Sequence, residues 1–139
     1  MKLVKLASCI AAVVIASAMG GAAYAHELEK VDTVFERAIP NIPGKSLVAV
    51  VVTYGPGGKS VPHRHAGSAF IYAHVLSGAI RSQVDDEPAK VYRAGENFHE
   101  VPGSHHRVSE NASDREPASL LAVFVVDSQE ASLTVSDQE

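Results

Sequence analysis

Residues 57–78 read GGKSVPHRHAGSAFIYAHVLSG, with the pair His63 and His65 near the centre of the stretch. Successive side chains of a β-strand point to opposite faces, so a single intervening residue puts both imidazoles on one face. A second His-rich segment, residues 95–111, offers a third imidazole. Imidazole is the commonest nitrogen ligand for metals in proteins. The two segments together therefore predict a metal site.

Short apolar runs separated by turn residues continue on both sides of this stretch. Residues 47–54, LVAVVVTY, are β-branched and continuously apolar, which predicts a well-buried strand. Further strands are expected at 60–65, 69–76, 79–84, 89–92, 97–101, 105–109 and 120–126. No segment after residue 45 has helical periodicity. This pattern is typical of one small all-β barrel or sandwich.

The segments that flank this predicted barrel, which we place at residues 47–127, are less regular. Residues 26–46 form an N-terminal lead-in, in which 28–38 is expected to be a strand or a single helical turn. Residues 128–139 are polar enough to be a frayed tail, with 133–135 at most an edge strand. No repeat or linker divides the chain, so a single domain is expected.

The N-terminus has the features of a secretory signal peptide. Lys2 and Lys5 precede an apolar run at 6–19, and residues 23–25, AYA, form a small-x-small cleavage site. The apolar run is too short to span a bilayer. Cys9 lies near the beginning of the run, whereas a lipid-attachment cysteine should close it. The sequence thus predicts cleavage after residue 25 and export to the periplasm or the medium.

Cleavage after residue 25 would leave 114 of the 139 residues and would remove the only cysteine. The mature chain would then have no disulfide, no thiolate ligand and no cysteine nucleophile. The signal peptide contains two of the 12 basic residues and none of the 16 acidic ones, which leaves 10 against 16 and a net charge of −6. Such a chain is poorly suited to bind nucleic acid or an anionic membrane. We expect its partner to be a small molecule.

The His-x-His segment resembles the first motif of the cupin family. That motif reads Gly, five residues, His-x-His, three or four residues, Glu, six residues, Gly. Gly57, His63, His65 and Gly78 follow its order. The resemblance covers most of the predicted mature domain, from about residue 47 to 127.

The later segment resembles the second cupin motif, which reads Gly, five residues, Pro-x-Gly, two residues, His, three residues, Asn. Gly95, Gly103, His106 and Asn111 follow this order. Two departures are visible: Val101 stands in the place of the Pro, with Pro102 at the position that follows, and one extra residue precedes Asn111.

The resemblance implies a jelly-roll β-barrel in which His63, His65 and His106 bind a divalent metal such as Fe, Zn, Mn, Ni or Cu. His105 competes with His106 for the third position, since neighbouring side chains on a strand point in opposite directions. Alignment with the motif selects His106. Small cupins are often dimers, so a homodimer is compatible with this resemblance.

The acidic ligand of the first motif is missing. It should fall at Ala69 or Phe70 counting forward from His65, or at Ile71 counting back from Gly78, and none of these is acidic. Strand parity instead predicts an apolar pocket wall on one face, with His74 on the other. The expected wall residues are Ala69, Ile71, Ala73, Val75 and Phe98.

His99 and Glu100 are neighbours on a predicted strand, so only one of them can face the interior. Either would supply a fourth ligand or an acid/base group. Parity cannot be carried across the Pro102-Gly103 turn, which leaves the choice open, although Glu100 is the preferred acid/base candidate.

Three neutral imidazoles leave a divalent metal its full charge and open positions at which a chelating anion can bind. Some cupin dioxygenases resemble this site, so the first hypothesis is a dioxygenase-like oxidoreductase acting on a small organic molecule. A non-catalytic cupin that uses metal to hold a ligand is the first alternative, and a metal-dependent isomerase or lyase is the second. The sequence has no Ser-His-Asp order, no phosphate loop and no paired carboxylates. Hydrolytic chemistry of those kinds is therefore not expected.

Overall fold

The computed structural model describes residues 28–138, so the expected signal peptide and Cys9 lie outside the described residues. Within this range all regular structure is β, which confirms the all-β prediction. The strands are β1 (Glu29–Ala38), β2 (Lys45–Tyr54), β3 (His63–His65), β4 (Phe70–Ser77), β5 (Ala79–Val84), β6 (Lys90–Arg93), β7 (Asn97–Glu100), β8 (His105–Asn111), β9 (Ala118–Asp127) and β10 (Thr134–Ser136). No helix in residues 28–138 is long and apolar enough to cross a membrane.

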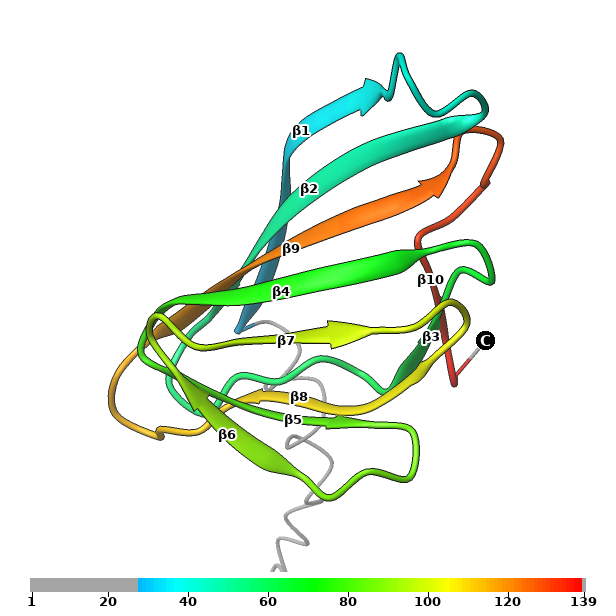
Figure 1. The fold of residues 1–139 in the computed structure, drawn as a ribbon. Coiled ribbons are helices and arrows are strands. Elements are labelled where there is room, and N and C mark those ends of the chain that lie inside the picture. Colours follow the sequence, from blue (N-terminus) through cyan, green and yellow to red (C-terminus); the bar gives the residue numbers. More distant parts are fainter. Residues whose placement is uncertain (1–27, 139) are drawn as a thin grey trace, which may run out of the picture.

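The strands form two five-stranded sheets, ordered β1-β2-β9-β4-β7 and β10-β3-β8-β5-β6 (Figure 1). All strand pairs within them are antiparallel. The hydrophobic core contains buried residues of both sheets, such as Phe124 of β9 and Ile80 of β5. Because β3 and β8 are neighbours, the two His-rich segments lie side by side.

The observed strands follow the predicted ones closely, and the main difference lies just before the His pair. Of the two alternatives expected for residues 28–38, the structure shows the strand, and β1 pairs with β2 along nearly its whole length. The strand expected at 60–65 is shorter: residues 63–65 pair with β10, and residues 63 and 64 also pair with β8. In the tail, residues 134–136 pair with β3 as an edge strand.

Burial alternates along the central strands of the first sheet, as expected where one face meets a core. On β4, Ile71, Ala73 and Val75 are almost completely buried. The other face of β4 exposes Phe70, Tyr72 and Leu76.

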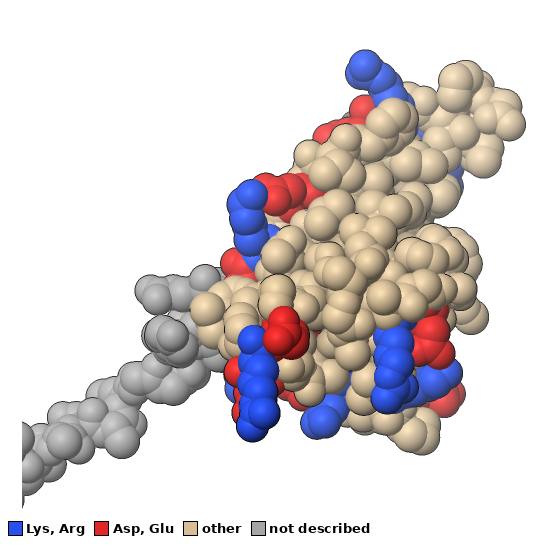
Figure 2. Space-filling model, turned by 90° about the vertical axis from the view of Figure 1, so that its left-hand side faces the viewer, with Lys and Arg blue, Asp and Glu red and all other residues tan. Residues whose placement is uncertain are grey.

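Charged side chains gather at the margins of the side of the molecule shown in Figure 2, with a broad uncharged area between them.

A β-bulge interrupts the pairing of β8 with β5. Gln83 pairs with Val108 and Val84 with His106, so Arg107 is the additional residue. The bulge changes the parity of the strand, and His106 and Asn111 are both buried although five positions separate them. The additional residue of the bulge therefore accounts for the one extra residue between His106 and Asn111 in the second motif.

Candidate metal centre

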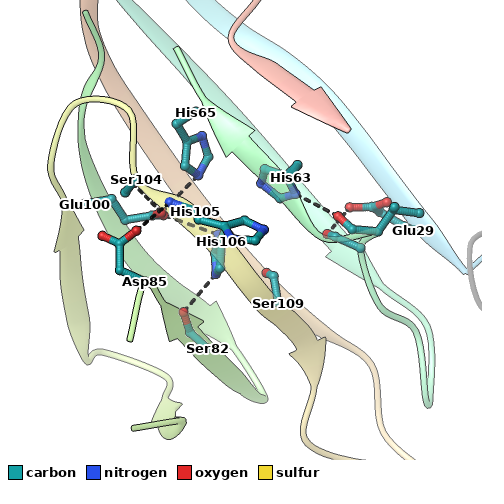
Figure 3. Close-up of polar contacts among 12 residues, drawn as sticks. Glu29, His63, His65, Ser82, Asp85, Glu100, Ser104, His105, His106 and Ser109 are labelled. Carbon is teal, nitrogen blue, oxygen red and sulfur yellow. Dashed lines mark hydrogen bonds and ion pairs between the residues drawn. The ribbon is translucent and has the colours of Figure 1, made fainter. Parts of the chain in front are cut away.

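Three imidazoles from neighbouring strands meet between the sheets. β3 supplies His63 and His65, and β8 supplies His106, which is the register partner of His63. One ring nitrogen from each lies within 4.8 Å of the others. His65 and His106 are buried and His63 is half-buried. Figure 3 shows the three rings turned toward one another.

The hydrogen bond of His63 identifies its free nitrogen. Nδ1 lies 2.8 Å from the carbonyl oxygen of Val61, and a carbonyl can only accept, so Nδ1 carries the proton. Burial lowers the pKa of His63, and it lowers the pKa of His106 to about 4. Both rings are therefore neutral at pH 7, and Nε2 of His63 presents a lone pair, which is the form that binds metal.

His65 provides the observation that tests whether a metal fits. Neither ring nitrogen has a hydrogen-bond partner among residues 28–138, although the side chain is buried. Its Nε2 lies 3.0 Å from Oε2 of Glu100 without the alignment of a hydrogen bond. Unsatisfied buried polar atoms are costly, and a cation bound to one ring nitrogen would remove the cost at that nitrogen. The residues present therefore fit a divalent metal.

Two polar groups hold the ring of His106. Its Nε2 is 2.9 Å from Oγ of Ser82 on the adjacent strand β5. Its Nδ1 is 3.4 Å from Oε1 of Glu100. A polar partner on one nitrogen fixes the ring orientation and leaves the other nitrogen for a ligand.

Glu100 enters this site from β7, whereas its neighbour His99 is exposed and lies beside Phe70 on the outer face. The Glu100 side chain is 3% exposed. Burial alone would raise its pKa, but the contact with His65 and the proximity of His106 outweigh burial, and the net pKa is lowered. Ser104 donates a hydrogen bond of 3.3 Å to the carboxylate. Glu100 is therefore ionised at neutral pH.

The remaining histidines that were considered lie outside the cluster. Nε2 of His105 is 2.7 Å from a carboxylate oxygen of Asp137. Nδ1 of His74, on the outer face of β4, is 3.1 Å from the hydroxyl of Tyr72. Among the described residues, the three-His group thus contains His106 and neither His105 nor His74.

A cavity of about 350 Å³ adjoins the cluster. Its apolar wall comes mainly from β2 and β9, with Val50, Val52, Leu120 and Phe124. The structure places the five expected wall residues in two groups. Ile71 lines this cavity, while the others lie in the hydrophobic core and do not line it: Ala69, Ala73, Val75 and Phe98.

The cavity also has a polar wall that sequence reasoning missed. The hydroxyl of Tyr54 is 2.5 Å from Oγ of Ser60 and 2.8 Å from Oγ of Ser109. Ser60 in turn donates to the carboxylate of Glu29. These four residues come from three strands and one loop, so no local pattern links them. Burial raises the pKa of Tyr54 to about 12.

We expect this raised pKa to make the fold sensitive to alkali. The folded pKa lies above the unfolded value of about 10, so stability is complete below pH 10 and falls by about 3 kcal/mol as the pH approaches 12. Tyr54→Phe should remove this slope. Urea unfolding at several alkaline pH values measures it, and tyrosinate absorbance should show one late-titrating tyrosine in the parent only. An equal slope in both proteins would contradict the assignment.

Comparison with known proteins gives one family match and several structural ones. The Cupin domain model matches residues 50–124. The structure is similar to an uncharacterised protein with a double-stranded β-helix domain from Klebsiella pneumoniae, at a TM-score of 0.59 and 20% identity over 73% of this chain and 80% of that one. No curated protein sequence matches the chain significantly.

Two enzymes are among the similar structures. An oxalate oxidase in complex with glycolate gives a TM-score of 0.60 and 23% identity over 79% of this chain. The DMSP lyase DddQ from Ruegeria pomeroyi gives a TM-score of 0.63 and 19% identity over 84% of this chain. The aligned region spans 55% of either enzyme, and at these identities the likeness concerns the fold alone. The family match covers more than half of this chain and shows that the chain belongs to the cupin family.

Proposed function

We propose that this chain is an exported, metal-binding cupin that acts on a small organic molecule by dioxygenase-like oxidoreductase chemistry. The observation that carries the proposal is the buried His65, whose two ring nitrogens have no hydrogen-bond partner among residues 28–138. It lies in the three-His group beside a cavity of ligand size. The N-terminal basic, apolar and small-residue pattern supports export.

His63, His65 and His106 would hold the metal. Nitrogen donors of this kind suit Fe, Zn, Mn, Ni or Cu. When bound, such a metal supplies Lewis acidity, and iron, manganese or copper adds redox capacity. The protein supplies neutral, buried rings in fixed orientations, with His63 oriented by Val61 and His106 by Ser82.

The cavity suggests what kind of molecule binds. The apolar wall of β2 and β9 would pack against a carbon skeleton, and the polar wall around Tyr54 would hydrogen-bond a distal polar group. An anionic chelating group, such as a catecholate or the enolate of a diketone, would face the histidines. A volume of about 350 Å³ accommodates a small metabolite.

Elemental analysis tests the metal site. We expect near-stoichiometric metal in the parent protein and almost none in a His63→Ala/His65→Ala variant, because two of three nitrogen donors are removed. A His74→Ala/His99→Ala variant is the matched control, because it removes two histidines outside the cluster. An equal metal content in all three proteins would exclude the three-His metal site.

Oxygen consumption by the iron-loaded protein then tests the reaction. We expect uptake with at least one member of a panel of diketones and catechols, and none in the His63→Ala/His65→Ala variant. A flat response across the panel, together with a metal-dependent binding signal, would favour a non-catalytic binder. Product formation without oxygen uptake would favour an isomerase or lyase.

A further inference from the structure

We propose that Glu100 is a fourth ligand of the metal, so that β7 supplies the carboxylate missing from the first motif. The inference rests on the metal-binding function proposed above and adds to it the composition of the site. Three observations carry it: the register of two strands, the distances around the carboxylate, and the position of the other acid in the cavity.

The register places Glu100 beside the position where the acid was expected. Counting back from Gly78, the acidic ligand of the first motif falls on Ile71, and Ile71 is the register partner of Glu100 in the β4–β7 pair. Partners in an antiparallel pair point to the same face, with Cβ atoms about 5 Å apart. Both side chains are buried and line the same cavity. The carboxylate therefore enters the site one strand away from its usual origin.

Two distances from Glu100, to His65 and to His106, match those between ligands of one metal. Bonds of about 2.1 Å at angles of 90 to 109° separate two ligand atoms by about 3.0 to 3.4 Å. The Glu100 oxygens lie 3.0 Å from Nε2 of His65 and 3.4 Å from Nδ1 of His106. The His65 contact lacks hydrogen-bond alignment. A cation between the ring and the carboxylate accounts for both the spacing and the unpartnered nitrogen.

Glu29 is the other acid that lines the cavity, and it belongs to the polar wall. Its carboxylate accepts a hydrogen bond from Ser60, which is also bonded to Tyr54. The close carboxylate contacts of His65 and His106 are with Glu100. Glu29 therefore serves as a matched control: an acid in the same cavity that is not expected to bind the metal.

Co²⁺ titration of the chelator-treated, full-length protein tests the assignment, with affinity and the visible d–d spectrum as readouts. Glu100→Gln keeps the size of the side chain and removes its charge. We expect it to weaken Co²⁺ binding by about 100-fold or more and to change the spectrum of the remaining complex, which loses an oxygen ligand. Glu29→Gln should keep the affinity within about threefold and the spectrum unchanged.

A rescue variant separates a ligand from a group that only orients His65. Exchanging the register partners, Ile71→Glu with Glu100→Ile, returns the carboxylate to β4 and should recover at least about tenfold of the lost affinity. An unchanged affinity or spectrum in Glu100→Gln would overturn the proposal, as would an equal loss in Glu29→Gln. A parent protein that binds no Co²⁺ would instead refute the metal-binding function itself.

Discussion

Replacing Gly78 by alanine is expected to destabilise the protein by about 3 to 5 kcal/mol, because strain and overpacking act together. Gly78 joins β4 to β5 with a φ of +68°, a conformation that side-chain-bearing residues rarely adopt. A Cβ atom there would lie 2.6 Å from the carbonyl oxygen of Pro117 and 2.9 Å from Cβ of Ala118. The clash involves backbone and cannot be relieved by turning a side chain. Urea unfolding of the variant beside the parent measures the loss.

Two other glycines separate the contributions of strain and clash. Gly95 has a φ of +89° with open space around its Cα, so Gly95→Ala should cost only about 1 to 2 kcal/mol. Gly67 has open space and no positive φ, and Gly67→Ala should change stability by less than about 0.5 kcal/mol. Similar losses at all three positions would contradict the steric explanation.

Acid is expected to destabilise the metal-free protein well before its carboxylates are all protonated. The folded pKa of His106 is about 4, below the unfolded value of about 6.5. Between these values the unfolded chain binds a proton that the folded chain does not, so stability is lost as the pH falls. His106 alone accounts for about 3 kcal/mol between pH 6.5 and 4. The lowered pKa of His63 acts in the same direction.

The measurement is urea unfolding in chelator at pH 7 and at points down to pH 4. His106→Gln should flatten the dependence on pH, because the group that titrates differently in the two states is gone. His99→Gln, which changes an exposed histidine, should retain the slope of the parent. If His106→Gln kept that slope as well, protonation of His106 would not be its cause.

Local periodicity was sufficient to predict most strands, whereas the resemblance to the two cupin motifs predicted that the two His segments meet. Alternation along residues 69–76 predicted a buried face, and the structure buries Ile71, Ala73 and Val75. The predicted ligand pair on β3 needed only the two-residue period of a strand. Such features depend on neighbours in the chain, which a single sequence displays.

Features that depend on pairing between distant strands were not predictable. Whether Glu100 or His99 enters the site depends on the register of β7 with β4. The alternation of side chains cannot be counted from His106 back through the Pro102-Gly103 turn, so the sequence does not reveal this register. The continuous apolar run of β2 does not reveal which of its residues face the cavity. Glu29 and Tyr54 are register partners from segments with no shared motif, so their joint polar wall was missed.

The bulge on β8 has a consequence for comparing this chain with its relatives. Because Arg107 is looped out of the ladder, a gap opened at this one position restores the usual spacing between His106 and Asn111. Asn111 donates to the carbonyl oxygens of Gly55 at 3.0 Å and of Glu116 at 2.7 Å, so it ties two loops together from its shifted place in the chain. The side chains of His106 and Asn111 both still point inward, although the number of residues between them differs from the motif. A search that demands fixed intervals would overlook chains that carry the same one-residue insertion.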